Sequence, residues 1–142
     1  MDVDYVVTVE TKGIPLAYEV AKSLGIELVI IRRENKVTEG PTVSINYLSG
    51  TSGRIQQMSL AKKSMKPSSR CVFIDDFLRG GGTAQGITDL LKEFDSELVG
   101  TGVLVDNVGV ANKRVTDYVS IIDVEHISED GKIKVTPSSL IK

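Results

Sequence analysis

The chain has 142 residues, 41% of them hydrophobic and 25% charged, which is enough for one globular domain with its own core. Its formal net charge is −2, and this balance argues against nucleic-acid binding by this segment alone, because such surfaces are strongly basic. The sequence has one cysteine, no secretory signal and no long apolar run, so we expect a cytoplasmic protein without disulfides or membrane contact.

The first part of the chain predicts a strand, a helix and a second strand. Residues 5–9 form a short apolar run, and the loop that follows contains a cation and a glycine: Glu10, Thr11, Lys12 and Gly13. A helix should begin near Pro15 and end at Gly25, with an apolar face formed by Leu16, Ala17, Val20, Ala21 and Leu24. Residues 27–31 predict the second strand of a βαβ unit, and this strand enters the basic run 32–36.

The next segment predicts a hairpin. Residues 42–48 alternate well enough for a strand, 49–53 (SGTSG) suit a flexible turn, and 54–60 suit a returning strand. No acidic residue occurs between Glu39 and Asp75, whereas five basic residues do: Arg54, Lys62, Lys63, Lys66 and Arg70. A run of this kind is often a solvated face, but we expect a flexible lid over about residues 40–68 that closes on a polyphosphate.

The central stretch of the chain is residues 71–84, CVFIDDFLRGGGTA. Its apolar start, which includes Cys71, predicts a strand buried on both faces, and the acids that follow, Asp75 and Asp76, should point different ways. The glycines leave backbone N–H groups open to an anion, and a helix expected after Thr83 adds the attraction of its N-terminus. We therefore expect a phosphate-and-ribose site, with a glycine turn and incidental acids as the simpler alternative. The loop matches neither GxxxxGK[ST] nor GxGxxG.

The remainder of the chain completes an α/β fold. The helix after the glycine loop should bury Ile87, Leu90, Leu91 and Phe94. Strands are expected at 98–105 and 119–124, a short helix at 111–117, and weak strand character in the polar tail. This alternation predicts a doubly wound, mainly parallel five-stranded sheet of order 2-1-3-4-5. Ligands bind such sheets beyond the carboxyl ends of strands 1 and 3, so the loops at 10–13 and 75–83 should meet there.

The segment VFIDDFLRGGGT (72–83) closely resembles the phosphoribosyl-pyrophosphate-binding motif of the type I phosphoribosyltransferases, an apolar run followed by DD and a GGT loop. The resemblance implies that Asp75 and Asp76 hold the ribose hydroxyls. It implies that the 5′-phosphate is held by Phe77, Leu78, Arg79, Gly80, Gly81, Gly82 and Thr83. Residues 9–17 and 32–36 are similar to segments that face pyrophosphate in the family, which implicates Glu10, Thr11, Lys12, Gly13, Arg32, Arg33 and Lys36. Mg²⁺ would be bound by ligand oxygens rather than by a protein cage.

Other features of the chain depart from the enzymes of this family. Phe77 and Arg79 replace the small or aliphatic residues common in the enzymes' loop, and the segments 9–15, 32–40 and 43–65 are more similar to the effector domains of Gram-positive purine operon repressors. We therefore expect a non-catalytic domain that binds phosphoribosyl pyrophosphate, or a related pyrophosphorylated nucleotide such as a guanine alarmone, and senses purine supply. The resemblance implies a homodimer that reaches DNA only through an N-terminal domain absent from this chain.

The main alternative is an active purine phosphoribosyltransferase, which transfers the phosphoribosyl group to a purine base and releases pyrophosphate. Such an enzyme needs a base site, and after the fourth strand this chain offers residues 106–109 and no aromatic residue before Tyr118. A dinucleotide-binding enzyme is disfavoured because the glycine loop follows the third strand and lacks GxGxxG. A two-component receiver domain shares the strand order but would not need GGGT after its acids.

Overall fold

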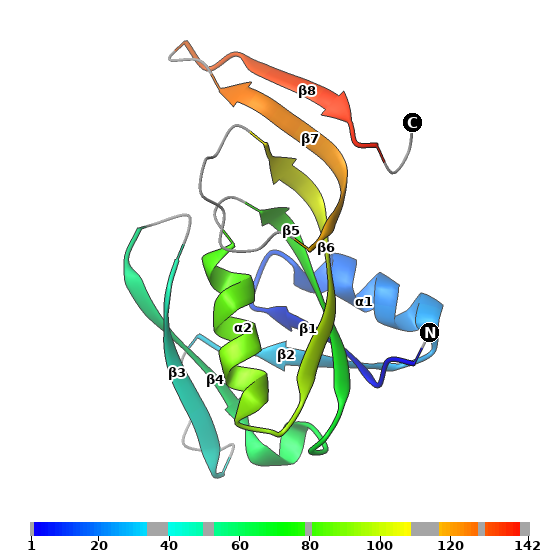
Figure 1. Cartoon of the computed structure of the whole chain (residues 1–142), viewed down its shortest axis with the longest axis vertical. Coiled ribbons are helices and arrows are strands. Elements are labelled where there is room, and N and C mark those ends of the chain that lie inside the picture. Colours follow the sequence, from blue (N-terminus) through cyan, green and yellow to red (C-terminus); the bar gives the residue numbers. More distant parts are fainter. Residues whose placement is uncertain are drawn as a thin grey trace.

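The described part of the chain folds as a sheet with two α-helices and a separate hairpin (Figure 1). The structure is a computed structural model, and it describes residues 2–33, 40–49, 53–78, 81–108, 117–127 and 130–139. The strands are β1 (Tyr5–Val9), β2 (Glu27–Ile31), β3 (Thr42–Leu48), β4 (Ile55–Ala61), β5 (Arg70–Leu78), β6 (Glu97–Asn107), β7 (Val119–Ile127) and β8 (Ile133–Pro137). The helices are α1 (Ile14–Leu24) and α2 (Gly82–Lys92), and a short 3₁₀ turn covers Lys62–Ser64. None of the helices in these ranges is long and apolar enough to cross a membrane.

The main sheet has the strand order β2-β1-β5-β6-β7-β8. Its first five members are parallel and follow the predicted order 2-1-3-4-5, so the predicted fold class is confirmed. An edge strand that the prediction did not count, β8, pairs antiparallel with β7. The short helix predicted at 111–117 lies outside the described residues except for its last position.

Within the described residues, each face of the sheet carries one helix. Because side chains alternate along β1, Val6 and Val7 belong to different faces. Val6 is buried with Ala17 and Ala21 of α1, whereas Val7 belongs to a larger cluster beneath α2. The topology therefore separates two apolar layers, and the layer under α2 is the larger.

The predicted buried residues of this helical segment are confirmed: Ile87, Leu90 and Leu91 of α2, and Phe94 just after it, are at most 6% exposed. Cys71 is likewise fully buried, as its place in an apolar strand predicted. The prediction for Leu24 is wrong, since this side chain is 44% exposed. The helix ends at Gly25 in a left-handed cap (φ 69°), so Leu24 stands in the last turn, beyond the part of the helix that covers the sheet.

The predicted hairpin is present as a two-stranded antiparallel sheet of β3 and β4, with Thr42 opposite Ala61 and Leu48 opposite Ile55. It lies beside α2 in Figure 1 and shares its core. Tyr47 and Met58 are buried in the same cluster as α2, so most of the hairpin is part of the domain core. The lid predicted over about residues 40–68 stays a prediction, and residues 50–52 of it lie outside the described residues.

The basic residues after the hairpin lie at the amino-terminal edge of the sheet. β4 bridges to β2 in antiparallel fashion, through Arg32 and Ser59, and therefore carries the chain back to the amino-terminal edge of the sheet. There the Lys66 N–H donates a hydrogen bond to the Tyr5 hydroxyl (3.3 Å), and Arg70 pairs with Glu97 (3.3 Å). Lys62, Lys63, Lys66 and Arg70 therefore lie at the far end of β5, about 30 Å from the glycine loop, whereas Arg54 lies at the other end of the hairpin. Closure of a lid over a polyphosphate stays a prediction.

Candidate functional site

The two predicted anion loops meet at the carboxyl edge of the sheet. β1 and β5 are adjacent parallel strands, with Tyr5 opposite Cys71 and Val7 opposite Phe73. The loop after β1 consequently crosses the end of β5. A Cβ atom placed on Gly13 would lie 2.8 Å from Asp75 Oδ1 and 2.8 Å from Thr8 Oγ1. Only glycine permits so close an approach, which is the structural reason for Gly13 in this loop.

The two acids at the end of β5 differ in their surroundings. The Asp76 backbone N–H donates a hydrogen bond to Asp75 Oδ1 (2.8 Å), so the orientation of the Asp75 carboxyl is held by its own strand. Asp75 follows Phe73 on the face of the sheet that α2 covers, whereas Asp76 follows Ile74 on the α1 face. The two side chains thus leave the strand on opposite faces, yet the carboxyls still lie close enough to each other to interact, and the groups that they bind stay a prediction.

Burial changes the acid–base behaviour of Asp75. Desolvation, together with a hydrogen bond to the Asp76 side chain, raises the pKa of Asp75 to about 7. The hydrogen bond from the Asp76 backbone and the positive charge of Arg33 oppose this rise. At neutral pH the carboxyl is poised between its two forms, a property common at binding and catalytic sites.

One glutamate of the loop after β1 binds the basic residues that follow β2. Glu10 Oε2 lies 3.3 Å from Arg32 Nη1, and Glu10 Oε1 accepts a hydrogen bond from the Arg33 N–H (2.8 Å). Glu10 thereby joins the start of the loop after β1 to Arg32 and Arg33 at the end of β2. The side chains of Thr11, Lys12 and Arg33 are exposed, as a site for an anion from solution requires. Lys36 lies outside the described residues.

The glycine loop leads into the N-terminus of α2. Gly81 has φ +77°, a left-handed conformation that favours glycine, and its carbonyl accepts a hydrogen bond from the Gln85 N–H (3.1 Å). The first turn of α2 contains no acidic residue, so its N–H groups and dipole are available to an anion. Leu78 is buried, Phe77 is 37% exposed and Thr83 is half-buried. Arg79 and Gly80 lie outside the described residues.

Sequence reasoning missed three residues near this edge. Thr8 is fully buried, and among the described residues its hydroxyl has no hydrogen-bond partner, although it lies beside Gly13 and close to Asp75. The sequence signal for Thr8 was a polar residue within an apolar strand. Tyr118 donates a hydrogen bond to Asp106 Oδ2 (2.7 Å) at the end of β6, so the aromatic residue that looked distant in sequence stands at the same edge. Tyr47, from the hairpin, had no sequence signal.

The oxygen donors of this site suit Mg²⁺. Asp75 and Asp76 supply carboxylates and Thr8 an orphan hydroxyl, all hard donors of the kind that Mg²⁺ prefers. Within the described ranges, no cluster of three or more His, Cys, Asp or Glu side chains could hold a metal ion. Mg²⁺ held by the two carboxyls would keep several water ligands, as it does in most protein sites.

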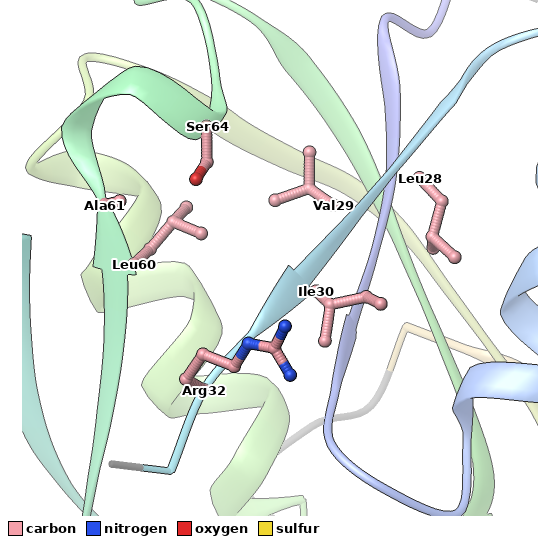
Figure 2. Close-up of a pocket in the computed structure, with 7 residues that line it drawn as sticks. All are labelled: Leu28, Val29, Ile30, Arg32, Leu60, Ala61 and Ser64. Carbon is pink, nitrogen blue, oxygen red and sulfur yellow. The ribbon is translucent and has the colours of Figure 1, made fainter. Parts of the chain in front are cut away.

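A separate pocket of about 280 Å³ follows the open edge of β2 (Figure 2). Apolar side chains of β2 and β4 line it, with Ser64 at one end and Arg32 at the other. It forms where β4 diverges from β2 beyond the bridge between Arg32 and Ser59. Asp75 and the described residues of the glycine loop do not line it, but Arg32 belongs both to this pocket and to the site at the carboxyl edge.

Comparison with known proteins identifies relatives of this chain. The phosphoribosyl transferase domain family matches residues 2–136. The purine biosynthesis transcriptional repressor PurR of Bacillus subtilis is 53% identical over 131 residues, which cover 92% of this chain and 46% of that protein. The purine biosynthesis transcriptional activator PurR of Lactococcus lactis is 42% identical over 125 residues, 88% of this chain and 46% of that protein. The chain thus spans about half the length of these relatives.

Solved structures of adenine phosphoribosyltransferases share the fold. The Giardia lamblia enzyme, in complex with 9-deazaadenine, superposes with a TM-score of 0.75 at 22% identity, covering 87% of this chain and 71% of the enzyme. The Saccharomyces cerevisiae enzyme gives a TM-score of 0.73 at 19% identity, with 84% and 66% coverage. At such identities the similarity establishes the architecture alone, and it agrees with the parallel sheet described above.

Proposed function

The chain belongs to the phosphoribosyl transferase domain family, and from that premise we propose that it binds phosphoribosyl pyrophosphate, or a related pyrophosphorylated nucleotide, as the effector domain of a purine-type transcriptional regulator. One observation carries the proposal: the loop after β1 packs directly on Asp75, at the end of the strand that the glycine loop follows on its way to α2. A ligand with phosphates at both ends of a sugar would fill this arrangement.

Each part of the site has a role in this proposal. Asp75 and Asp76 accept hydrogen bonds from the ribose hydroxyls, and the backbone between Leu78 and Thr83 holds the 5′-phosphate. Lys12, Arg32 and Arg33 face the pyrophosphate. Mg²⁺, when bound, would neutralise pyrophosphate charge, and Asp75 and Asp76 are the carboxyls that would accept hydrogen bonds from its water ligands.

The experiment that tests the proposal is isothermal titration calorimetry of the chain with phosphoribosyl pyrophosphate, with and without Mg²⁺. We expect saturable one-to-one binding that weakens by at least about tenfold when the metal is chelated, because bare phosphate charges then repel one another and the acid pair. Ribose 5-phosphate serves as the control ligand, since it lacks pyrophosphate and should bind more weakly. The absence of a saturable signal with Mg²⁺ would refute the proposal.

Binding should depend on pH through Asp75. Hydroxyl donors of a ligand favour the ionised carboxylate, so binding lowers the pKa of Asp75 from about 7 and releases protons. Affinity should therefore rise from pH 6 to pH 8, by up to about tenfold per pH unit below the pKa of the free protein. Calorimetry in buffers of different ionisation enthalpy measures the proton release. Asp75→Asn is the control, because position 75 no longer titrates in this variant while the ligand still does. If the affinity of the variant changed with pH as that of the wild type does, Asp75 would be excluded as the cause.

The proposal further assigns the chain to sensing rather than catalysis. Phe77 lies at the end of β5, is 37% exposed, and is bulkier than the residues common in the enzymes' loop. Tyr118 is the only aromatic residue among those described near the end of β6, and its hydroxyl donates a hydrogen bond to Asp106. Both close relatives described above are named as transcriptional regulators. Contact with DNA would come from the part of such regulators that this chain does not match, and we propose a homodimer as the working form.

We therefore expect no nucleotide formation from phosphoribosyl pyrophosphate with adenine, guanine, hypoxanthine or xanthine. Transfer requires a base held next to the sugar carbon as pyrophosphate leaves, and positioning of that kind supplies much of the rate enhancement in such reactions. Chromatographic detection of nucleotide and pyrophosphate would measure it, with an adenine phosphoribosyltransferase as positive control. Steady turnover of any of these bases, abolished by Asp75→Ala, would establish the enzyme alternative.

A further inference from the structure

The first strand buries one polar side chain that has no hydrogen-bond partner. Thr8 is fully buried, and within the described residues its hydroxyl is one of two buried hydroxyls that lack a partner. Burial of a hydroxyl costs free energy unless the group is hydrogen-bonded, so each such group requires an explanation. Valine has nearly the same shape and occupies the neighbouring positions of β1. Packing of the core therefore gives no reason for a hydroxyl at position 8.

The Thr8 hydroxyl and the Asp75 carboxyl both face Gly13. A Cβ atom on Gly13 would lie 2.8 Å from Thr8 Oγ1 and 2.8 Å from Asp75 Oδ1, so the two oxygens are at most twice that distance apart. They come from neighbouring strands, whose pairing ends at Val7 and Phe73. Thr8 thus lies just beyond the part of β1 that pairs with β5, where the loop after β1 reaches the end of β5.

The Asp75 carboxyl can accept a further hydrogen bond. Its Oδ1 accepts one from the Asp76 backbone N–H (2.8 Å), and a carboxylate offers about four lone-pair sites in total. Thr8 can donate one hydrogen bond, which needs an O···O distance of about 2.7–2.8 Å. A relative shift of at most about 3 Å therefore brings the hydroxyl into hydrogen-bond distance of the carboxyl.

The glycine beside the two oxygens belongs to the loop that we assign to pyrophosphate. Gly13 is buried, and its carbonyl accepts a hydrogen bond from the Ala17 N–H (2.9 Å), which joins the loop to α1. Thr11 and Lys12, directly before it, are exposed. An anion bound by these exposed residues would act on the backbone that carries Gly13, and so on the contact between the two oxygens.

From these contacts we propose that Thr8 is a positioning residue: with ligand bound, its hydroxyl donates a hydrogen bond to the Asp75 carboxyl and fixes the direction in which that carboxyl meets the ribose hydroxyls. The unfavourable burial of the hydroxyl is then relieved in the complex, and this difference between the two states favours binding. The inference rests on the proposed function for the identity of the ligand and the role of Asp75.

Thr8→Val tests the inference because it removes the hydroxyl and keeps the shape of the side chain. The affinity for phosphoribosyl pyrophosphate with Mg²⁺, measured by calorimetry, should fall by at least about fivefold. The urea midpoint without ligand should stay at or above the wild-type value, because a buried hydroxyl without a partner has been removed. A residue that only supported the fold would change affinity and stability in the same direction.

Thr8→Ser is the conservative variant, since it keeps the hydroxyl and loses a methyl group. It should bind within about twofold of the wild type, although it unfolds at lower urea concentration. Ser59→Ala is the matched control. Ser59 carries the other buried hydroxyl without a partner among the described residues, and it contacts Arg32 through backbone hydrogen bonds that alanine keeps. Its affinity should also stay within about twofold of the wild type.

Thr8→Val in an Asp75→Ala background tests whether Thr8 acts through the carboxyl. The loss of affinity should be clearly smaller there than in the wild-type background, as a double-mutant cycle between coupled groups requires. Equal losses in the two backgrounds overturn the inference, and so does unchanged affinity in Thr8→Val or an equal loss in Thr8→Ser or Ser59→Ala. In each of these cases the wild type still binds, so the proposed function stands. Absence of binding by the wild type refutes the proposed function and this inference with it.

Discussion

Replacing Asp76 or Asp75 by Ala should weaken the binding of phosphoribosyl pyrophosphate by at least about tenfold and leave the fold intact. Each carboxylate lost removes a charge-assisted acceptor for a ribose hydroxyl, a contact worth roughly 1.5–3 kcal/mol. The Asp75 variant should be at least as stable as the wild type at neutral pH. Its folded-state pKa of about 7 exceeds the unfolded value of 3.8, so ionisation of this buried acid makes the folded state less favourable as pH rises from about 4 to 7.

Calorimetry measures the affinity, and unfolding by denaturant measures the stability. Asp89→Ala is the matched control, because Asp89 is an exposed acid of α2 whose contacts with Gln85 and Lys92 stay within that helix. Loss of affinity without loss of stability would mark Asp75 and Asp76 as binding residues. Unchanged affinity in a well-folded Asp76→Ala variant would remove this residue from the site.

The second large effect is expected for Gly86→Ala. In an exposed helix this change stabilises by about 0.5–1 kcal/mol, because alanine is the better helix former. Here the new methyl group would meet Tyr47 Cβ at 2.8 Å, and that atom lies next to the backbone of β3, where it has little freedom to shift. We expect a net loss of about 1–3 kcal/mol in the free energy of unfolding, the usual cost of overpacking.

Urea unfolding measures this loss, and hydrogen exchange of β3 and β4 locates it. Gly100→Ala is the matched control, since a Cβ atom at Gly100 of β6 would have Val72 Cγ1 as its nearest neighbour at 3.6 Å, an ordinary contact. That variant should unfold within about 0.5 kcal/mol of the wild type. If Gly86→Ala left the free energy of unfolding unchanged as well, the hairpin would pack against α2 less tightly than these distances indicate.

The sequence by itself determined the parallel core of this protein and the place of the two loops to which we assign ligand binding. Local patterns suffice for that: apolar runs at 5–9, 27–31 and 71–74 mark strands, and a 3.6-residue period marks the helix that buries Ile87 and Leu90. Given alternating strands and helices, the right-handed crossover rule leaves few topologies, and each of them that puts strands 1 and 3 side by side brings Gly13 toward Asp75.

Only the tertiary structure decided where the chain goes once it leaves this regular pattern. Composition showed that residues 54–70 are basic but not which edge of the sheet they reach, and the antiparallel course of β4 placed Arg70 at the edge opposite the glycine loop. The raised pKa of Asp75, the orphan hydroxyl of Thr8 and the contact between Gly86 and Tyr47 also depend on packing between distant segments. Desolvation and close contact arise from neighbours far along the chain, so local sequence patterns carry no record of them.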